Sequence, residues 1–163
     1  MFSCSNPAHD TRWTYNGGWT TVACGGYNFV GPYTLSNYLY APTLYFKDSH
    51  AGVKISFLFG SFDSWDHERF VLRVNGIDTF QVRPCLDRGS RTQLCRNTAW
   101  NDQLDRISVG VNHTAQTMSL QFFSELNQDA WDESWGICDL QITAYPYQVD
   151  KYGNPLDGGN ANY

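Results

Sequence analysis

The sequence predicts an all-β fold, a two-sheet antiparallel β-sandwich of the jelly-roll kind with very little helix. Three observations support this prediction. Apolar and polar residues alternate in several short runs, as they do in strands with one buried face. A dipeptide typical of tight hairpin turns directly follows one of these runs. No stretch shows a sustained 3.6-residue apolar period between helix caps. Short strands separated by turns are typical of sandwiches and jelly rolls.

The clearest strand is expected at 53–59, where Val, Ile and Phe occupy every second position. Residues 70–74 alternate in the same way and are followed at once by Asn75-Gly76. Because both residues of this pair tolerate positive φ, we expect a hairpin there. Segment 97–106 is expected to hold a short helical turn at most. Further strands are expected at 107–111, 118–122 and 137–142, and weaker ones at 19–22, 27–30 and 43–46.

Composition restricts the class of protein. The 163 residues are 16% aromatic and only 17% charged, which argues against disorder, because disordered chains are poor in aromatic residues and rich in charge. The net charge is −5 and no basic stripe is present, which argues against nucleic-acid binding. No apolar run approaches the roughly 20 residues that span a bilayer, so we expect no membrane span. We therefore expect a single sandwich domain over residues 1–144.

Residues 145–163 differ from the rest of the chain, because they are rich in Gly, Asn, Pro and Tyr and almost lack aliphatic side chains. Such a segment has little apolar surface to bury against its own domain. We expect an extended tail that serves as an assembly arm and adds to the sheet edge of a neighbouring copy. The sequence thus predicts a homo-oligomer or filament. The tyrosines that would fill pockets on the neighbour are Tyr145, Tyr147, Tyr152 and Tyr163.

Five cysteines bear on the cellular compartment. Sequence alone does not determine how two disulfides are paired among them. The most economical pairing joins Cys85 to Cys95 around an Arg-rich loop and Cys4 to Cys24 near the amino end, which leaves Cys138 free. Disulfides favour an extracellular or cell-surface location. Five buried, reduced thiols in a cytosolic protein are the alternative.

One tripeptide has the form of a glycosylation site. Asn112-His113-Thr114 matches the Asn-X-Thr acceptor and lies between the strands expected at 107–111 and 118–122. We therefore expect Asn112 to be exposed on a turn, and to carry a glycan if the chain passes through a eukaryotic secretory pathway.

Two acidic segments that each contain a tryptophan stand out. Segment 63–68 reads D-S-W-D-H-E, and segment 132–137 reads D-E-S-W-G-I. Together with the strand and Asn-Gly turn after the first segment, these motifs resemble a jelly-roll module of secreted and surface proteins. That module is frequent in ciliates and other protists and occurs in some bacterial exported proteins. The resemblance covers about residues 25–142, and it implies a fold and a compartment far more than an activity.

The carboxylates of these segments are candidate ligands of a structural calcium ion. Several carboxylates close together repel one another unless something neutralises them, and Ca²⁺ does so through hard oxygen ligands. The alternative is that the carboxylates cap turns and pair with Arg69, Arg73 or Arg106. Both possibilities remain open at this point. The candidate ligands are Asp63, Asp66, Glu68, Asp132, Glu133 and Asp139.

The sequence lacks the motifs of common enzyme classes. It has no E-x-D-x-x-E strand of the jelly-roll glucanases and no G-x-S-x-G nucleophile motif. It also has no H-E-x-x-H zinc motif. We therefore expect a protein that is not an enzyme.

Two non-catalytic functions remain. The first is a structural or adhesive role, as a self-assembling filament or surface-coat subunit that uses its tail and sheet edges, and we rank it slightly first. The alternative is carbohydrate binding, in which sugar rings stack on exposed aromatic side chains. The position of residues 145–163 distinguishes the two, because a tail that lies on its own domain, together with exposed aromatic residues on one face, favours sugar binding. The aromatic candidates are Trp131, Tyr15 and Trp19, whereas Trp65 and Trp135 are expected in the core.

Overall fold

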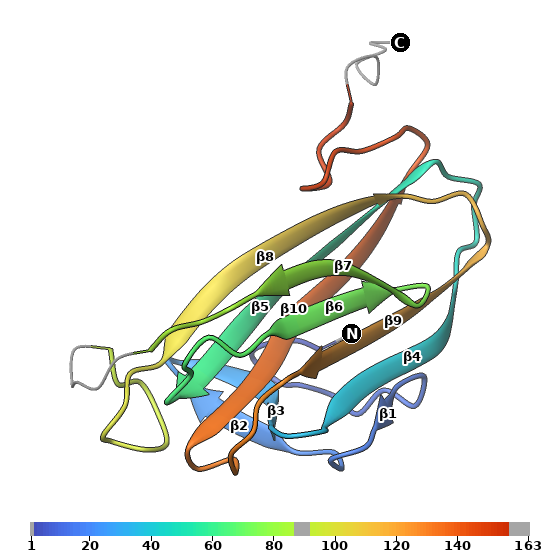
Figure 1. The fold of residues 1–163 in the computed structure, drawn as a ribbon. Coiled ribbons are helices and arrows are strands. Elements are labelled where there is room, and N and C mark those ends of the chain that lie inside the picture. The colour runs from blue at the N-terminus through green and yellow to red at the C-terminus, as the bar shows by residue number, and fades with distance from the viewer. Residues whose placement is uncertain (1, 87–91, 157–163) are drawn as a thin grey trace.

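A computed structural model of the protein describes residues 2–86 and 92–156 (Figure 1). Within these ranges the chain forms ten strands and no helix, so the all-β prediction is confirmed. Every predicted strand overlaps an observed one. None of the described segments is a helix of the length and apolar character needed to cross a membrane. The strands are β1 (Thr14–Tyr15), β2 (Thr21–Cys24), β3 (Tyr27–Tyr33), β4 (Tyr38–Tyr45), β5 (Gly52–Asp63), β6 (Phe70–Val74), β7 (Ile77–Val82), β8 (Gln103–Asn112), β9 (Thr117–Ser124) and β10 (Glu133–Tyr145).

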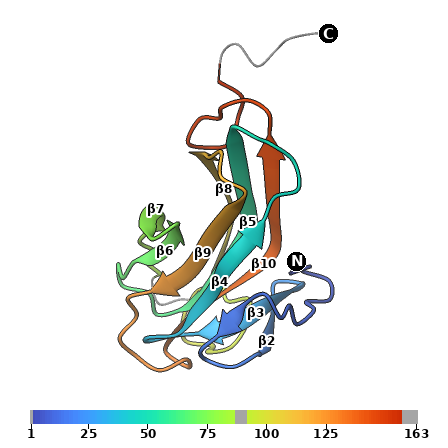
Figure 2. The same ribbon diagram turned by 90° about the vertical axis from the view of Figure 1, so that its right-hand side faces the viewer.

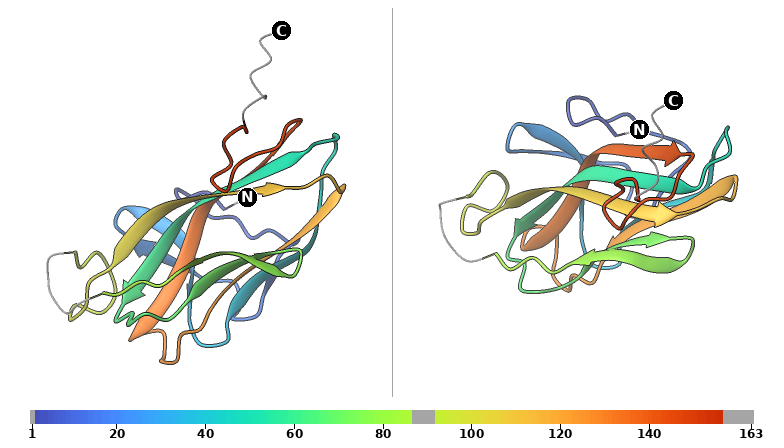
Figure 3. Two further views of the ribbon diagram at one scale, coloured as in Figure 1. Left: turned by 45° about the horizontal axis from the view of Figure 1, so that its top comes forward. Right: turned by 90° about the horizontal axis from the view of Figure 1, so that it is seen from above.

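The strands form two antiparallel sheets that pack face to face. The first sheet has the order β1-β4-β9-β6-β7, and the second sheet has the order β2-β3-β10-β5-β8. Figure 2 shows the molecule turned by 90°, with β6 and β7 on one side and β5 and β10 on the other. The right panel of Figure 3 separates the same two layers from above. This arrangement confirms the predicted two-sheet sandwich.

The core lies between the sheets and is filled by one side of each alternating strand. Val53, Ile55, Phe57 and Phe59 of β5 are fully buried. The ring of Phe59 stacks on Phe70 of the first sheet, with the centroids 4.1 Å apart. Burying side chains of this size stabilises the fold by roughly 1.5–3 kcal/mol each. Because the intervening residues point the other way, each sheet also presents side chains on an outer face.

The hairpin between β6 and β7 forms where the Asn-Gly pair predicts it. Asn75 and Gly76 have φ angles of 50° and 80°, and they connect Val74 to its partner Ile77. The side-chain oxygen of Asn75 accepts a hydrogen bond from the backbone N–H of Ser119 at 2.8 Å. The turn is thereby joined to β9, and it holds β7 at the edge of the first sheet.

Two disulfides hold other segments on the outer face of the second sheet. Cys4 is bonded to Cys138 of β10, and Cys24 at the end of β2 is bonded to Cys95. Both bonds lie beside a small second core on that face. Its other fully or nearly buried side chains are Phe29, Leu58 and Phe62.

The predicted pairing of Cys85 with Cys95 and of Cys4 with Cys24 is therefore wrong, and Cys138 is not free. Strand order, not closeness in sequence, decides which cysteines meet, because the bonded pairs are 134 and 71 residues apart. The amino-terminal segment runs beside β3, where a backbone N–H donates to the carbonyl of Cys4 at 2.8 Å, and so reaches β10. Among the described residues, Cys85 is the free cysteine, and it is exposed.

The described part of the tail lies against the same sheet. β10 continues to Tyr145, and Tyr147 stacks on that ring with the centroids 5.2 Å apart. Val149 is only 3% exposed. The hydroxyl of Ser108 in β8 donates to the carbonyl oxygen of Tyr152 at 2.6 Å. Residues 145–156 thus pack on their own domain.

Two glycines of the second sheet explain how a tail with few aliphatic side chains can pack there. A Cβ on Gly52 would lie 2.6 Å from the carbonyl oxygen of Tyr147. A Cβ on Gly110 would lie 1.9 Å from the carbonyl oxygen of Asp150. The N–H of Gly110 also donates to the carbonyl of Lys151 at 2.9 Å. The tail is therefore held by close backbone contact together with the buried side chain of Val149.

Candidate functional site

The outer face of the first sheet presents two adjacent rows of aromatic and polar side chains. In one row Tyr40 of β4 lies beside Gln121 of β9, which lies beside Arg73 of β6. In the next row Tyr38 lies beside Phe123. These residues alternate along their strands with buried core residues, so strand pairing brings them together on one surface.

Arg73 of β6 is held by three neighbours on this face. Its Nε donates to Oδ1 of Asp78 at 2.7 Å, and its Nη1 donates to Oε1 of Gln121 at 3.3 Å. The guanidinium carbon lies 4.7 Å from the centroid of the Phe123 ring. The side chain is 36% exposed, so part of it still faces solvent. A guanidinium fixed in this way keeps planar hydrogen-bond donors in place for a ligand.

A cleft of about 380 Å³ lies on this face. It combines two phenol rings with a guanidinium, an amide and a hydroxyl. Its volume falls within the range of roughly 300–1,000 Å³ that is usual for small-molecule sites. We call it the outer-face cleft, and its lining residues are Tyr38, Tyr40, Arg73, Gly76, Ser119 and Gln121.

A second arginine supports the same face. Arg69 donates from Nη1 to Oε1 of Gln81 at 2.8 Å and from Nη2 to Oε1 of Glu125 at 2.5 Å. The hydrogen bond from Arg69 lowers the pKa of Glu125. Arg69 also lies 3.7 Å from Asp78, the partner of Arg73. Both acids are therefore paired with arginine, and the surface around the cleft has little net charge.

The three aromatic residues predicted to bind glycan lie in two places. Trp131 is 67% exposed, and the guanidinium of Arg96 lies 4.8 Å from its ring centroid. Tyr15 and Trp19 are partly buried and pack on each other and on Phe2. Among the described rings, Trp131 stacks with neither of them. The prediction that the tryptophans of the two acidic motifs belong to the core is confirmed, since both are 0% exposed.

The two acidic segments meet in space. Asp63 at the end of β5 lies opposite Glu133 at the start of β10. The N–H and the hydroxyl of Ser64 both donate to the carbonyl oxygen of Asp132 at 2.7 Å. The indole N–H of Trp65 donates to a backbone carbonyl of β10 at 2.8 Å. These bonds hold the connection between β5 and β6 against the beginning of β10.

The six candidate calcium ligands nevertheless separate into different environments. Asp66, Glu68 and Glu133 come together, with one carboxylate oxygen of each within 4.8 Å of the others. Asp139 instead pairs with Arg106 at 2.6 Å. The structure thus brings three of the six candidate ligands together, where the connection between β5 and β6 meets the start of β10.

Asp63 belongs to a separate, arginine-paired group. Its Oδ2 lies 3.5 Å from Nε of Arg96, and its Oδ1 accepts a hydrogen bond from the N–H of Asn97 at 3.0 Å. Burial, with a smaller contribution from the charge of Asp102, raises the pKa of Asp63 to about 7. Asp139, which pairs with Arg106, therefore follows the alternative in which the acids pair with arginines, whereas Asp63 pairs with Arg96, an arginine that was not predicted.

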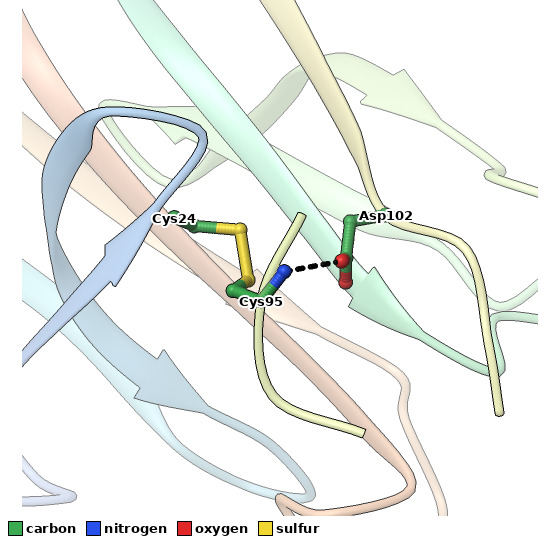
Figure 4. Close-up of side chains that lie close together, drawn as sticks. All are labelled: Cys24, Cys95 and Asp102. Carbon is green, nitrogen blue, oxygen red and sulfur yellow. Dashed lines mark hydrogen bonds between the residues drawn. A yellow bond between two sulfur atoms is a disulfide. The ribbon is translucent and has the colours of Figure 1, made fainter. Parts of the chain in front are cut away.

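A further group of potential ligand atoms lies around Cys24, Cys95 and Asp102 (Figure 4). The two sulfurs are joined in a disulfide, so neither is available as a thiolate ligand. Asp102 accepts hydrogen bonds from the backbone N–H groups of Leu94 and Cys95 at 2.7 and 2.9 Å. This buried carboxylate positions the loop that carries the disulfide.

Asn112 lies at the end of β8 and is exposed. Its side-chain oxygen accepts a hydrogen bond from the N–H of Val149 at 3.1 Å. Glycosylation at this residue stays a prediction.

The tyrosines predicted to mediate assembly do not form a separate arm in the described residues. Tyr145 and Tyr147 stack on each other, and the ammonium group of Lys151 lies 4.9 Å from the ring centroid of Tyr152. Tyr152 is 55% exposed. Tyr163 lies outside the described residues.

The outer-face cleft was not among the predicted sites, although the sequence contains a signal for it. Tyr38 and Tyr40 flank the buried Leu39, and Arg73 lies in a strand whose other residues are apolar. The same alternation that identifies the core also identifies the opposite face of each strand. Which strands become neighbours depends on the sheet order, and that order decides which of these residues share a surface.

Comparison with known proteins gives likenesses of fold only. No protein-family model matches the chain, and no curated protein matches it. A family 35 carbohydrate-binding module from an environmental isolate shares 14% identity at a TM-score of 0.44, covering 81% of this chain and 92% of that one. The C-terminal family 6 module of a marine laminarinase from Zobellia galactanivorans shares 16% identity at a TM-score of 0.43, and the match covers 80% of this chain and 97% of that one. A family 36 module of a xylanase from the hindgut metagenome of Trinervitermes trinervoides shares 13% identity at a TM-score of 0.41, and the match covers 81% of this chain and 95% of that one. At this level of similarity, no site residue is carried over to this chain.

Proposed function

We propose that this chain is a non-catalytic, extracellular carbohydrate-binding module whose ligand lies in the outer-face cleft. The observation that supports this most directly is the cleft itself, in which two tyrosines lie beside a fixed arginine, a glutamine and a serine on an open sheet face. The proposed ligand class is a neutral oligosaccharide or polysaccharide.

The chemistry of sugars matches these side chains. A sugar ring presents C–H groups, which pack favourably on the electron-rich face of an aromatic ring. Tyr38 and Tyr40 supply such rings, and Arg73 and Gln121 supply donors and acceptors for hydroxyl groups. Because Arg73 is already fixed by its partners, binding would order few additional rotamers. The pairing of both nearby acids with arginine favours a neutral glycan over an acidic one.

The disulfides and the tail support the remaining parts of the proposal. Disulfides form and persist in oxidising compartments, and two of them join distant parts of this domain. Residues 145–156 lie on their own sandwich, which removes the main argument for an assembly arm. We therefore place sugar binding ahead of filament or coat assembly.

The test is a binding titration with a panel of neutral polysaccharides, namely laminarin, xylan, mannan, galactan and dextran, followed by affinity electrophoresis. Tyr40→Ala and Arg73→Ala should each weaken binding of the preferred glycan by about tenfold or more, as central contact residues do. Tyr45→Ala is the matched control, because Tyr45 lies on the same strand, is 81% exposed and does not line the outer-face cleft.

Two results would contradict the proposal. Absence of binding to any member of the panel would argue against neutral glycans as ligands. Binding that survives Tyr40→Ala but is lost in Trp131→Ala would move the sugar site to the exposed tryptophan beside Arg96.

A further inference from the structure

We propose that Asp66, Glu68 and Glu133 form a calcium-binding site that fastens the connection between β5 and β6 to the start of β10. This inference does not depend on sugar binding, because none of these residues lines the outer-face cleft. The sequence predicted six candidate calcium ligands, and this proposal retains the three that the fold brings together.

The first observation is the distance between the carboxylates. One oxygen of each of the three residues lies within 4.8 Å of the others. Oxygens bound to one Ca²⁺ lie about 2.3–2.6 Å from the ion, and therefore at most about 5 Å from one another. The three oxygens already satisfy this limit, so an ion could be bound without moving the strands.

The second observation is independent and concerns Glu133. Its side chain is 0% exposed, and Oε1 has no hydrogen-bond partner among the described residues. Its other oxygen accepts a long hydrogen bond of 3.4 Å from the N–H of Asn127. A buried carboxylate oxygen without a partner is costly unless a proton or a cation satisfies it. This oxygen belongs to a carboxylate that points into the acidic cluster.

No basic side chain takes the place of the ion. Within residues 2–86 and 92–156, neither Lys, Arg nor His forms an ion pair with any of the three carboxylates. Three carboxylates therefore lie together without a basic partner among the described residues, and a divalent cation could neutralise them.

The ligand chemistry points to calcium among the common divalent cations. All three side chains offer hard oxygen atoms, and the cluster contains no imidazole or thiolate that would favour zinc. Asp66 is exposed, so water molecules can complete the coordination on that side. The scaffold is already fixed by the hydrogen bonds of Ser64 and Trp65 to the second acidic segment. A calcium ion would add a further link between the β5–β6 connection and the start of β10, which these hydrogen bonds already hold together.

The test uses the full chain after treatment with EDTA and desalting. Calcium chloride is titrated at pH 8 by calorimetry, and the melting temperature is measured with calcium and with EDTA. We expect one bound ion with a Kd of about 0.1–1 mM, as in other extracellular modules, and a higher melting temperature with calcium. Glu133→Gln should abolish the heat of binding and melt above the wild type in EDTA, because it removes the unpaired buried charge.

Two further variants separate a binding role from a folding role. Asp66→Asn alters an exposed ligand and should weaken binding about tenfold or more while leaving the fold intact. Asp48→Asn removes one exposed negative charge elsewhere and should bind calcium like the wild type. No heat and no shift with the wild type up to about 10 mM calcium, well above the Kd of weak extracellular sites, would mean that a proton alone satisfies Glu133. Equal calcium binding by Glu133→Gln and the wild type would likewise overturn the proposal.

Discussion

The two outer faces of the sandwich are made by similar alternating strands but differ in what lies on them. On the second sheet, outward-facing Leu58 and Phe62 are buried beside the disulfides, and residues 146–156 lie over the other end. On the first sheet, Tyr40 and Arg73 remain partly exposed and line a cleft. Apolar and aromatic residues on the outward side of a strand therefore do not reveal whether a face is open to a ligand. The role of the face depends on whether another segment of the chain covers these residues.

Glu133 of the second sheet differs from the acidic residues near the outer-face cleft in how its charge is neutralised. On the first sheet, Asp78 and Glu125 are exposed and paired with arginine. On the second sheet, Glu133 is buried without an arginine, and burial raises its pKa to about 7. Glu133 therefore changes its protonation state near neutral pH.

We call the outer face of the second sheet the covered face. Removing a disulfide from it should have the largest effect on stability. Replacing Cys24 and Cys95 by serine removes a link across 71 residues. We expect the free energy of unfolding to fall by roughly 2–5 kcal/mol, because the unfolded chain gains freedom, and chemical denaturation measures it. Cys85→Ser is the control and should leave the midpoint unchanged, since Cys85 is free and exposed. If the double variant and this control had equal midpoints, the disulfide would not be what stabilises the covered face.

A smaller effect is expected where the tail contacts β8. In Gly110→Ala the new methyl group would meet the backbone of residues 150 and 153 at 1.9 and 2.4 Å, so the tail must move. We expect a loss of roughly 1–3 kcal/mol, together with faster hydrogen exchange in residues 146–156. Thr143→Ala, at an exposed position on β10, which β5 separates from β8, should change neither quantity. Unchanged exchange in Gly110→Ala would show that the tail does not depend on this contact.

Acidification from pH 8 to about pH 6.5 should stabilise the calcium-free protein. Asp63 and Glu133 have pKa values raised to about 7, against about 4 in an unfolded chain, so the folded state binds more protons in this range. The free energy of unfolding therefore rises as pH falls. Below about pH 6.5 the effect is opposed by His113, whose pKa is lowered by burial and by His50. Glu133→Gln should flatten the dependence measured in EDTA, and a steeper slope in that variant would contradict this account.

The smallest effect on stability is expected from a substitution on the outer face of the first sheet, which we call the open face. Arg73→Ala removes partly exposed ion-pair and ring contacts, which contribute at most about 1 kcal/mol. The same substitution should remove most of the glycan binding. The free energy of unfolding is measured by chemical denaturation and the affinity for the glycan by titration, on the same preparation of the variant. A large loss of stability with normal binding would show that the open face supports the fold and is not a ligand site.

The fold was predictable because strand alternation is local. The period-2 runs around Ile55, Leu72 and Leu120 each identify a strand and its core side without knowledge of its neighbours. The Asn75-Gly76 turn likewise depends only on the φ angles that these two residues tolerate.

The contacts between strands were predictable only in part. A shared calcium ion would require the two acidic motifs to meet, and they do. Which carboxylates pair with arginines was not predictable, because Arg96 and Arg106 lie on other segments. The disulfides show the same limit, since Cys4 reaches Cys138 only when β3 and the amino-terminal segment lie beside β10. The outer-face cleft also depends on β4, β9 and β6 being neighbours, and this order is not visible in any single strand.

The bond between Cys4 and Cys138 has a mechanical consequence. It closes a covalent ring whose two ends are 134 residues apart, and this ring includes nine of the ten described strands and part of the last. A force pulling on the chain from both sides of this ring would pass through the sulfur atoms and leave the strands inside it unloaded. In a single-molecule pulling experiment, the extension gained on rupture should come from residues outside the ring, until a reductant opens it.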